Sequence, residues 1–234
     1  DPRGTAVHYP LAMAYRGLGD AKLADAHIQL QGSVKIDPPD PLLAELDELL
    51  ESPRAYDIRG GRALETGDWA TAAEQFRKGL DLDPTSAALR LRLGTALFQM
   101  GQSGAAQAQF EQVLKDSPTY ARAHYSLGVL AAAAGNRDQA LERLAAAVKF
   151  GPDDPSSRIS YGSVLRQSGR LREALDQYEQ ALKLDSRRPD AVLGVAEILG
   201  AMNRYPEARD RLLQANRAYP EEPEYAHGLA RLFA

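Results

Sequence analysis

The segment GDWATAAEQFRKGLDLDP, residues 67–84, returns in similar form as GRLREALDQYEQALKLDS, residues 169–186. Few positions are identical, but small, aromatic and acidic residues fall at the same places in both segments. The two segments begin 102 residues apart, which is three times 34. A fixed separation of this kind indicates an internal repeat, and the repeat decides the fold.

Three series of residues recur every 34 positions. A glycine, replaced by asparagine in the last repeat, is found at Gly67, Gly101, Gly135, Gly169 and Asn203. An alanine is found at Ala72, Ala106, Ala140, Ala174 and Ala208. A large apolar residue is found at Phe76, Phe110, Leu144, Tyr178 and Leu212. Because the three series share one register, the repeat has 34 residues.

Each repeat is expected to form two helices. With Pro53 counted as position 1, positions 4, 7, 8 and 11 lie on one face of a first helix. Positions 17, 20, 24, 27 and 28 lie on one face of a second helix. The glycine at position 15 can adopt the left-handed conformation that ends a helix, and the proline near position 32 cannot continue one. One such hairpin cannot bury both faces, so the hairpins must stack on one another.

The segment LRLGTALFQMGQSGAAQAQFEQVLKDSP, residues 91–118, carries Leu-Gly at positions 7 and 8, alanine at 20, an aromatic residue at 24 and proline at 32. In these features the chain resembles the tetratricopeptide repeat family over residues 53–220. It departs from the usual pattern at Arg59, where leucine is usual, and at Ser186, where proline is usual. The resemblance implies an all-α fold, a right-handed α-solenoid of stacked antiparallel helix hairpins.

The repeat register divides the chain into segments. Residues 53–220 are expected to hold five tandem repeats, at 53–86, 87–120, 121–154, 155–188 and 189–222. Residues 1–36 fit the same template and are expected to form a further N-terminal repeat. Residues 37–52 are an insertion, which we interpret as a short helix at about 41–51, with an ordered loop as the alternative. Residues 223–234 match the first helix of another repeat.

The C-terminal helix carries more apolar residues than a capping helix usually shows. Tyr225, Leu229, Leu232 and Phe233 leave it little polar surface. The sequence therefore suggests a self-association patch at this end, and with it a homo-oligomer.

Composition excludes several classes of function. The 234 residues contain 28 Lys and Arg against 32 Asp and Glu, and the net charge of -4 argues against nucleic acid as a partner. The chain has no cysteine, so it has neither disulfides nor thiolate metal sites. No apolar run approaches the ~18 residues of a membrane span, so no membrane insertion is expected. The chain begins at Asp1 without a methionine, which leaves both a cytoplasmic location and an extracytoplasmic one after leader removal open.

No catalytic residue, metal site or cofactor is predicted. The four histidines, His8, His27, His124 and His227, lie in different repeats and form no HExxH pair. There is no GxSxG motif and no phosphate-binding loop. The carboxylates of residues 37–41 and 152–155 are better explained as helix caps than as calcium ligands.

The resemblance implies that the first helices of the repeats line a concave face that binds other proteins. On these helices, positions 2, 5, 9 and 12 face away from the paired helix, and position 6 borders them. The candidate peptide-binding residues on this face are Arg54, Leu91, Arg92, Phe98, Arg122, Tyr125, Val129, Ile159, Ser163, Arg166 and Leu193.

Position 5 is apolar in four consecutive repeats, at Leu91, Tyr125, Ile159 and Leu193. These side chains either pack between neighbouring first helices or form a ridge for an apolar peptide segment. Arginines flank the series, and arginine binds carboxylates in bidentate fashion. The expected partner is therefore a protein or peptide with apolar and acidic residues.

One subgroup of the family captures a partner's C-terminal carboxylate with lysine and asparagine at set positions of this face. Here the corresponding positions hold Asp57, Gly61 and Arg92. The clamp is not present in its usual form, so a chaperone-tail adaptor is not expected.

Together these features predict a non-catalytic scaffold that binds protein or peptide. One alternative is a structural module whose function is self-association, and another is a helical-repeat part of a larger multidomain protein. RNA binding would require basic stripes with regularly spaced stacking aromatics, which the chain lacks.

Overall fold

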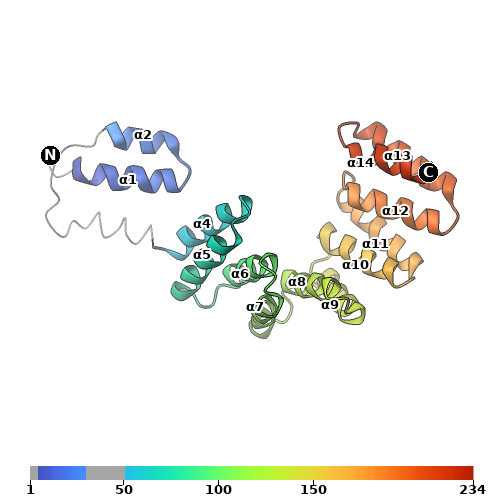
Figure 1. Cartoon of the computed structure of the whole chain (residues 1–234), viewed down its shortest axis with the longest axis horizontal. Helices are drawn as coiled ribbons and strands as arrows, with labels where there is room; N and C mark the ends of the chain where they lie inside the picture. The colour runs from blue at the N-terminus through green and yellow to red at the C-terminus, as the bar shows by residue number, and fades with distance from the viewer. Residues whose placement is uncertain (1–4, 30–50, 234) are drawn as a thin grey trace. The chain divides into compact units, whose positions relative to one another are not determined.

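The computed structural model describes residues 5–29 and 51–233, and within these residues the chain forms helices and no strand (Figure 1). The prediction of an all-α fold built from stacked helix hairpins is confirmed. With the labels of Figure 1, the helices are α1 (Thr5–Gly17), α2 (Ala21–Gln29), α4 (Pro53–Glu65), α5 (Trp69–Leu82), α6 (Ala87–Gln99), α7 (Ser103–Asp116), α8 (Ala121–Ala133), α9 (Arg137–Phe150), α10 (Pro155–Gln167), α11 (Leu171–Leu184), α12 (Pro189–Ala201), α13 (Tyr205–Ala218) and α14 (Pro223–Phe233).

The chain divides into two compact units, Asp1–Gln109 and Phe110–Ala234, which we call unit 1 and unit 2, and the boundary falls within α7. In unit 1, α1 packs against α2 and buries Ala12 and Ala24 completely. Also in unit 1, α5 packs against both α4 and α6. The insertion helix expected at about 41–51 falls outside the described residues.

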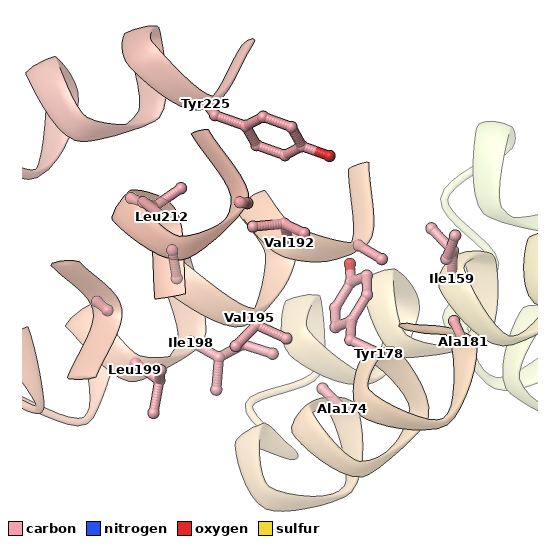
Figure 2. Packing of buried hydrophobic residues seen from close by; sticks show 14 of the residues in the cluster. Ile159, Ala174, Tyr178, Ala181, Val192, Val195, Ile198, Leu199, Leu212 and Tyr225 are labelled. Carbon is pink, nitrogen blue, oxygen red and sulfur yellow. The ribbon is translucent and has the colours of Figure 1, made fainter. Parts of the chain in front are cut away.

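Unit 2 is a continuous stack in which each helix packs against the next along the chain from α8 to α14. Its larger apolar cluster extends from α10 to α14, and Figure 2 shows Tyr178, Val195, Leu212 and Tyr225 converging from four helices. A smaller cluster around Leu144 joins α8, α9 and α10. The alanine and large apolar series of the repeat thus form the core.

The turns inside the hairpins use the predicted conformation. The glycines at position 15, Gly67, Gly101, Gly135 and Gly169, have φ between 75° and 78°. Asn203 takes the same place with φ of 60°, and it is the one residue other than glycine with positive φ in the described part of the chain. This left-handed geometry is the reason that glycine or asparagine recurs at this position.

Asp154 caps the N-terminus of α10, as expected for the carboxylates of residues 152–155. Its side chain accepts hydrogen bonds from the backbone N–H groups of Ser156 and Ser157, at 3.2 and 3.0 Å. Two of the N–H groups that a helix start leaves without partners are satisfied in this way.

Replacing Asp154 with alanine is expected to lower the free energy of unfolding by about 1 kcal/mol, because the capping bonds are lost. Urea unfolding followed by circular dichroism measures this change. Asp153→Ala is the matched control, since Asp153 is an exposed neighbour whose carboxylate caps no helix. An equal loss of stability in both variants would contradict the assignment of the cap.

The C-terminal helix differs from the sequence-based expectation. Tyr225 has 0% of its surface exposed, and its hydroxyl donates a 2.8 Å hydrogen bond to the backbone carbonyl of Arg187. Leu229 and Leu232 also pack against the larger cluster of unit 2. The expectation that Tyr225 belongs to an uncovered apolar patch is wrong, because α12 and α13 already cover it. The side chain of Phe233 lies outside the described residues.

Candidate functional site

The candidate residues lie on the first helices of the repeats, and in each unit the surface formed there by positions 2, 5, 6, 9 and 12 is called the first-helix face. In unit 1 it includes Arg54, Leu91, Arg92 and Phe98, on α4 and α6. In unit 2 it includes Arg122, Tyr125, Val129, Ile159, Ser163, Arg166 and Leu193, on α8, α10 and α12.

In unit 1, Arg92 lies across the preceding first helix. Its Nη1 atom is 3.3 Å from a carboxylate oxygen of Asp57. The same nitrogen lies 3.1 Å from the place that a Cβ at Gly61 would occupy, so the small residue makes room for the guanidinium. The three positions compared with the carboxylate clamp are therefore together in space, but Asp57 partly neutralises the cation.

In unit 2, α8 presents a cation beside apolar side chains. Arg122 is exposed and makes no ion pair with any residue in the described part of the chain. Tyr125 and Val129, three and seven residues further along, are half-buried on the same side of the helix. Tyr125 also packs against the cluster around Leu144, which holds it in place.

The structure resolves the two interpretations of position 5 for part of the series. Leu91 and Ile159 are only 6% and 8% exposed, so they pack between helices and offer almost no surface to a peptide. Leu193 lies against α14, since a Cβ at Gly228 would be 2.5 Å from its Cδ2 atom. In unit 2 these residues support the face from below, because Ile159 packs into the larger cluster and α14 covers Leu193.

Three successive first helices of unit 2 are joined by ion pairs. Arg166 of α10 lies 3.4 Å from Glu197 of α12, and Arg231 of α14 lies 3.2 Å from the same carboxylate. The three side chains are partly or largely exposed, so each pair contributes little to stability. Two cations share one anion, which leaves a net positive charge on this part of the face. We call Arg166, Glu197 and Arg231 the charged strip.

Tyr178 of α11 reaches the first-helix face through a gap between α10 and α12. A Cβ at Gly162 would lie 3.2 Å from its ring, and one at Gly194 would lie 2.5 Å from its Cζ atom. Only glycine on both sides lets the ring pass. Burial raises the pKa of the Tyr178 hydroxyl, while hydrogen bonding with Ser163 and the charge of Arg166 act in the opposite direction. The hydroxyl therefore lies beside the charged strip, at the edge of the face.

Two members of this site are absent from the sequence-based candidates. Arg231 continues the position 9 series that contains Ser163 and Glu197, so the repeat register could have identified it. The Tyr178 hydroxyl was missed because position 24 was interpreted as a core position only. The sequence feature that indicates the position of this hydroxyl is the pair Gly162 and Gly194, which lie on the two sides of the Tyr178 ring.

The described residues contain no group of three or more His, Cys, Asp or Glu side chains that could hold a metal ion. His8 and His27 of unit 1 approach each other, with 2.8 Å between their Nδ1 atoms, but no third ligand among the described residues joins them. No helix in the described ranges combines the length and apolar composition that a membrane crossing requires.

The stacked hairpins and their exposed first-helix face define a helical-repeat protein of the solenoid class. Two family models described as tetratricopeptide repeat match the chain, one at residues 63–109 and 165–232 and the other at 91–155. Together they span more than half of the sequence, and the chain belongs to the tetratricopeptide repeat family.

Solved structures share this fold at low sequence identity. PilF of Pseudomonas aeruginosa is 19% identical with a TM-score of 0.67, over 99% of this chain and 100% of that one. TTC0263, a thermophilic tetratricopeptide repeat protein of Thermus thermophilus, is 20% identical with a TM-score of 0.64, over 77% and 98%. YrrB, described as a tetratricopeptide repeat protein with an unusual peptide-binding site, is 21% identical with a TM-score of 0.57, over 80% and 97%. A search of curated protein sequences found no match.

Proposed function

We propose that the chain is a non-catalytic scaffold that binds a protein or peptide segment along its first-helix face. The family and its structural neighbours support a protein-interaction scaffold in general. The observation that carries the finer proposal is the surface of α8, where the exposed Arg122 stands beside the half-buried side chains of Tyr125 and Val129. An apolar side chain of a partner fits on Tyr125 and Val129, and a carboxylate of the partner pairs with Arg122.

The charged strip supports the same chemistry in the partner. Arg166 and Arg231 both pair with Glu197, and each guanidinium keeps donors for another carboxylate. Arg92 of unit 1 also keeps donors for another carboxylate, because Asp57 pairs with only one nitrogen of its guanidinium group. The preferred partner is therefore a segment that alternates apolar and acidic side chains.

The test is an array of short peptides that differ in their content of acidic, basic and aromatic residues. We expect the chain to retain peptides that are both acidic and apolar. The double variant Arg122→Glu, Arg166→Glu is expected to bind them about ten- to a hundredfold more weakly, since a hydrogen bond to a charged group contributes about 1.5–3 kcal/mol. Fluorescence polarisation with the retained peptides measures the affinity, and higher salt should weaken it.

The matched control is the double variant Arg137→Glu, Arg172→Glu, which makes the same change of net charge on the second helices α9 and α11. It is expected to keep the affinity of the unmodified chain, and circular dichroism checks that both variants are folded. Equal binding by the two double variants, or no preference for acidic peptides on the array, would show that the first-helix face is not the binding surface.

A further inference from the structure

A hollow of about 160 Å³ lies between α12, α13 and α14 in unit 2. Its apolar lining comes from Leu193, Ala196, Gly200, Leu212, Gly228 and Leu232. Glu197 and Arg231, two members of the charged strip, complete the wall. Because these two side chains are exposed on the first-helix face, the hollow opens onto that face.

The repeat explains why a hollow is present at this place. Thirty-four residues earlier, the equivalent space between Gly162 and Gly194 is filled by the ring of Tyr178. Thirty-four residues later, the equivalents of the two glycines are Ala196 of α12 and Gly228 of α14, and the equivalent of the tyrosine is Leu212. Leucine has no ring to extend toward the face, so the outer part of the slot is left open.

The repeat at residues 121–154 shows why leucine at position 24 does not by itself open a slot. Leu144 holds the same position there, but α8 and α9 approach so closely that a Cβ at Gly128 would lie 3.2 Å from the backbone nitrogen of Leu144. In the last repeat Ala196 replaces this glycine, and α12 and α13 are in less extensive contact than α8 and α9. The hollow therefore requires both a leucine at position 24 and a residue larger than glycine at position 8.

The size and chemistry of the hollow fit one aromatic ring. An apolar cavity of about 150 Å³ is large enough to bind benzene. Arg231 stands at the mouth with 73% of its side chain exposed, and its only ion pair within the described residues is with Glu197, which Arg166 shares. A carboxylate next to the ring would pair with Arg231, whose charge Glu197 neutralises only in part.

We propose that this hollow is an anchor subsite for a phenylalanine or tyrosine side chain of a partner, with an aspartate or glutamate beside it in the partner's sequence. The ring takes the place that Tyr178 takes one repeat earlier, and the carboxylate pairs with Arg231. The inference rests on the proposed function, because it assigns one side-chain subsite within the same face.

The subsite is tested with p-cresol, the side-chain analogue of tyrosine, by methyl NMR on the full chain. We expect saturable shifts and intermolecular NOEs at the methyl groups of Leu193, Leu212 and Leu232. These NOEs use the unmodified protein, so they do not depend on the folding of any variant. Unsaturable shifts spread over the surface would overturn the proposal.

Two variants and one control sharpen the test. Leu212→Phe places a ring in the slot from within, as Phe76 does against Gly60, and is expected to weaken p-cresol binding by at least about tenfold. The double variant Gly162→Ala, Tyr178→Leu is expected to open the equivalent slot beside Gly194 and to add a second set of shifts at Ile159 and Ile198. Leu184→Phe, at an exposed position of α11, should leave binding unchanged. Unaltered p-cresol affinity in Leu212→Phe would overturn the subsite.

The peptide array separates this inference from the proposed function. If peptides are retained but Leu212→Phe keeps full affinity for those with an aromatic residue, the scaffold stands and the subsite is overturned. If the arginine reversals have no effect while p-cresol still contacts Leu212, the subsite stands and the proposed partner chemistry is overturned.

Discussion

Replacing Tyr225 with alanine is expected to release α14 from the rest of unit 2. The ring is fully buried in one cluster with Val192 of α12 and Leu212 of α13 (Figure 2), and α14 has no second helix of its own within the described residues. Removing a buried aromatic side chain costs about 3–5 kcal/mol, and in a stacked array this cost falls on one interface. Hydrogen exchange should show lost protection of the α14 amides while α8 to α11 remain protected.

The control is Tyr225→Phe, which keeps the ring and removes only the hydroxyl. The hydrogen bond to the carbonyl of Arg187, 2.8 Å long, would be lost. A smaller loss of about 0.5–1.5 kcal/mol is expected, and α14 should remain docked. If the alanine variant kept full protection in α14, the burial of Tyr225 would not be what holds the helix.

Replacing Gly128 with alanine is expected to destabilise unit 2, although alanine is the better helix former. The new Cβ would lie 2.6 Å from Cγ of Leu144 and 3.2 Å from its backbone nitrogen, so α9 itself must move. Overpacking of this kind costs about 1–3 kcal/mol, which outweighs the gain in helix propensity of about 0.5–1 kcal/mol. The free energy of unfolding in urea should fall.

Gly104→Ala in α7 is the matched substitution without the clash. Nothing lies within 4 Å of the Cβ that it adds, and the position is exposed. It is expected to raise the free energy of unfolding by about 0.4–1 kcal/mol, because the unfolded chain loses freedom. Changes of the same sign at both glycines would contradict the close approach of α8 and α9.

The fold could be predicted because each part of the repeat has a local physical cause. Ala140 is fully buried where the two helices of a hairpin cross, and Gly135 has the positive φ that ends the first of them. Both requirements recur every 34 residues, so the register is visible without any structure. The insertion lacks this support, because its 16 residues occur once and have no counterpart in the other repeats.

The first-helix face was only partly predictable. Geometry within one helix places position 5 away from its own hairpin, but Leu91 and Ile159 are almost completely buried. The angle between successive hairpins decides this, and a single sequence does not show it. Gly228 of α14 shows the signal next to the last repeat, since the missing side chain makes room for Leu193.

The passage of Tyr178 between two glycines has a consequence for how such arrays diversify. The last two hairpins of unit 2 share one slot beneath the first helix, which Tyr178 fills in one and Leu212 leaves open in the other. Replacing the aromatic residue at position 24 by leucine, and the glycine at position 8 by alanine, changes which hairpin can bind an aromatic ring of a partner. Binding preference can thus move along the array by two substitutions while the backbone framework is kept.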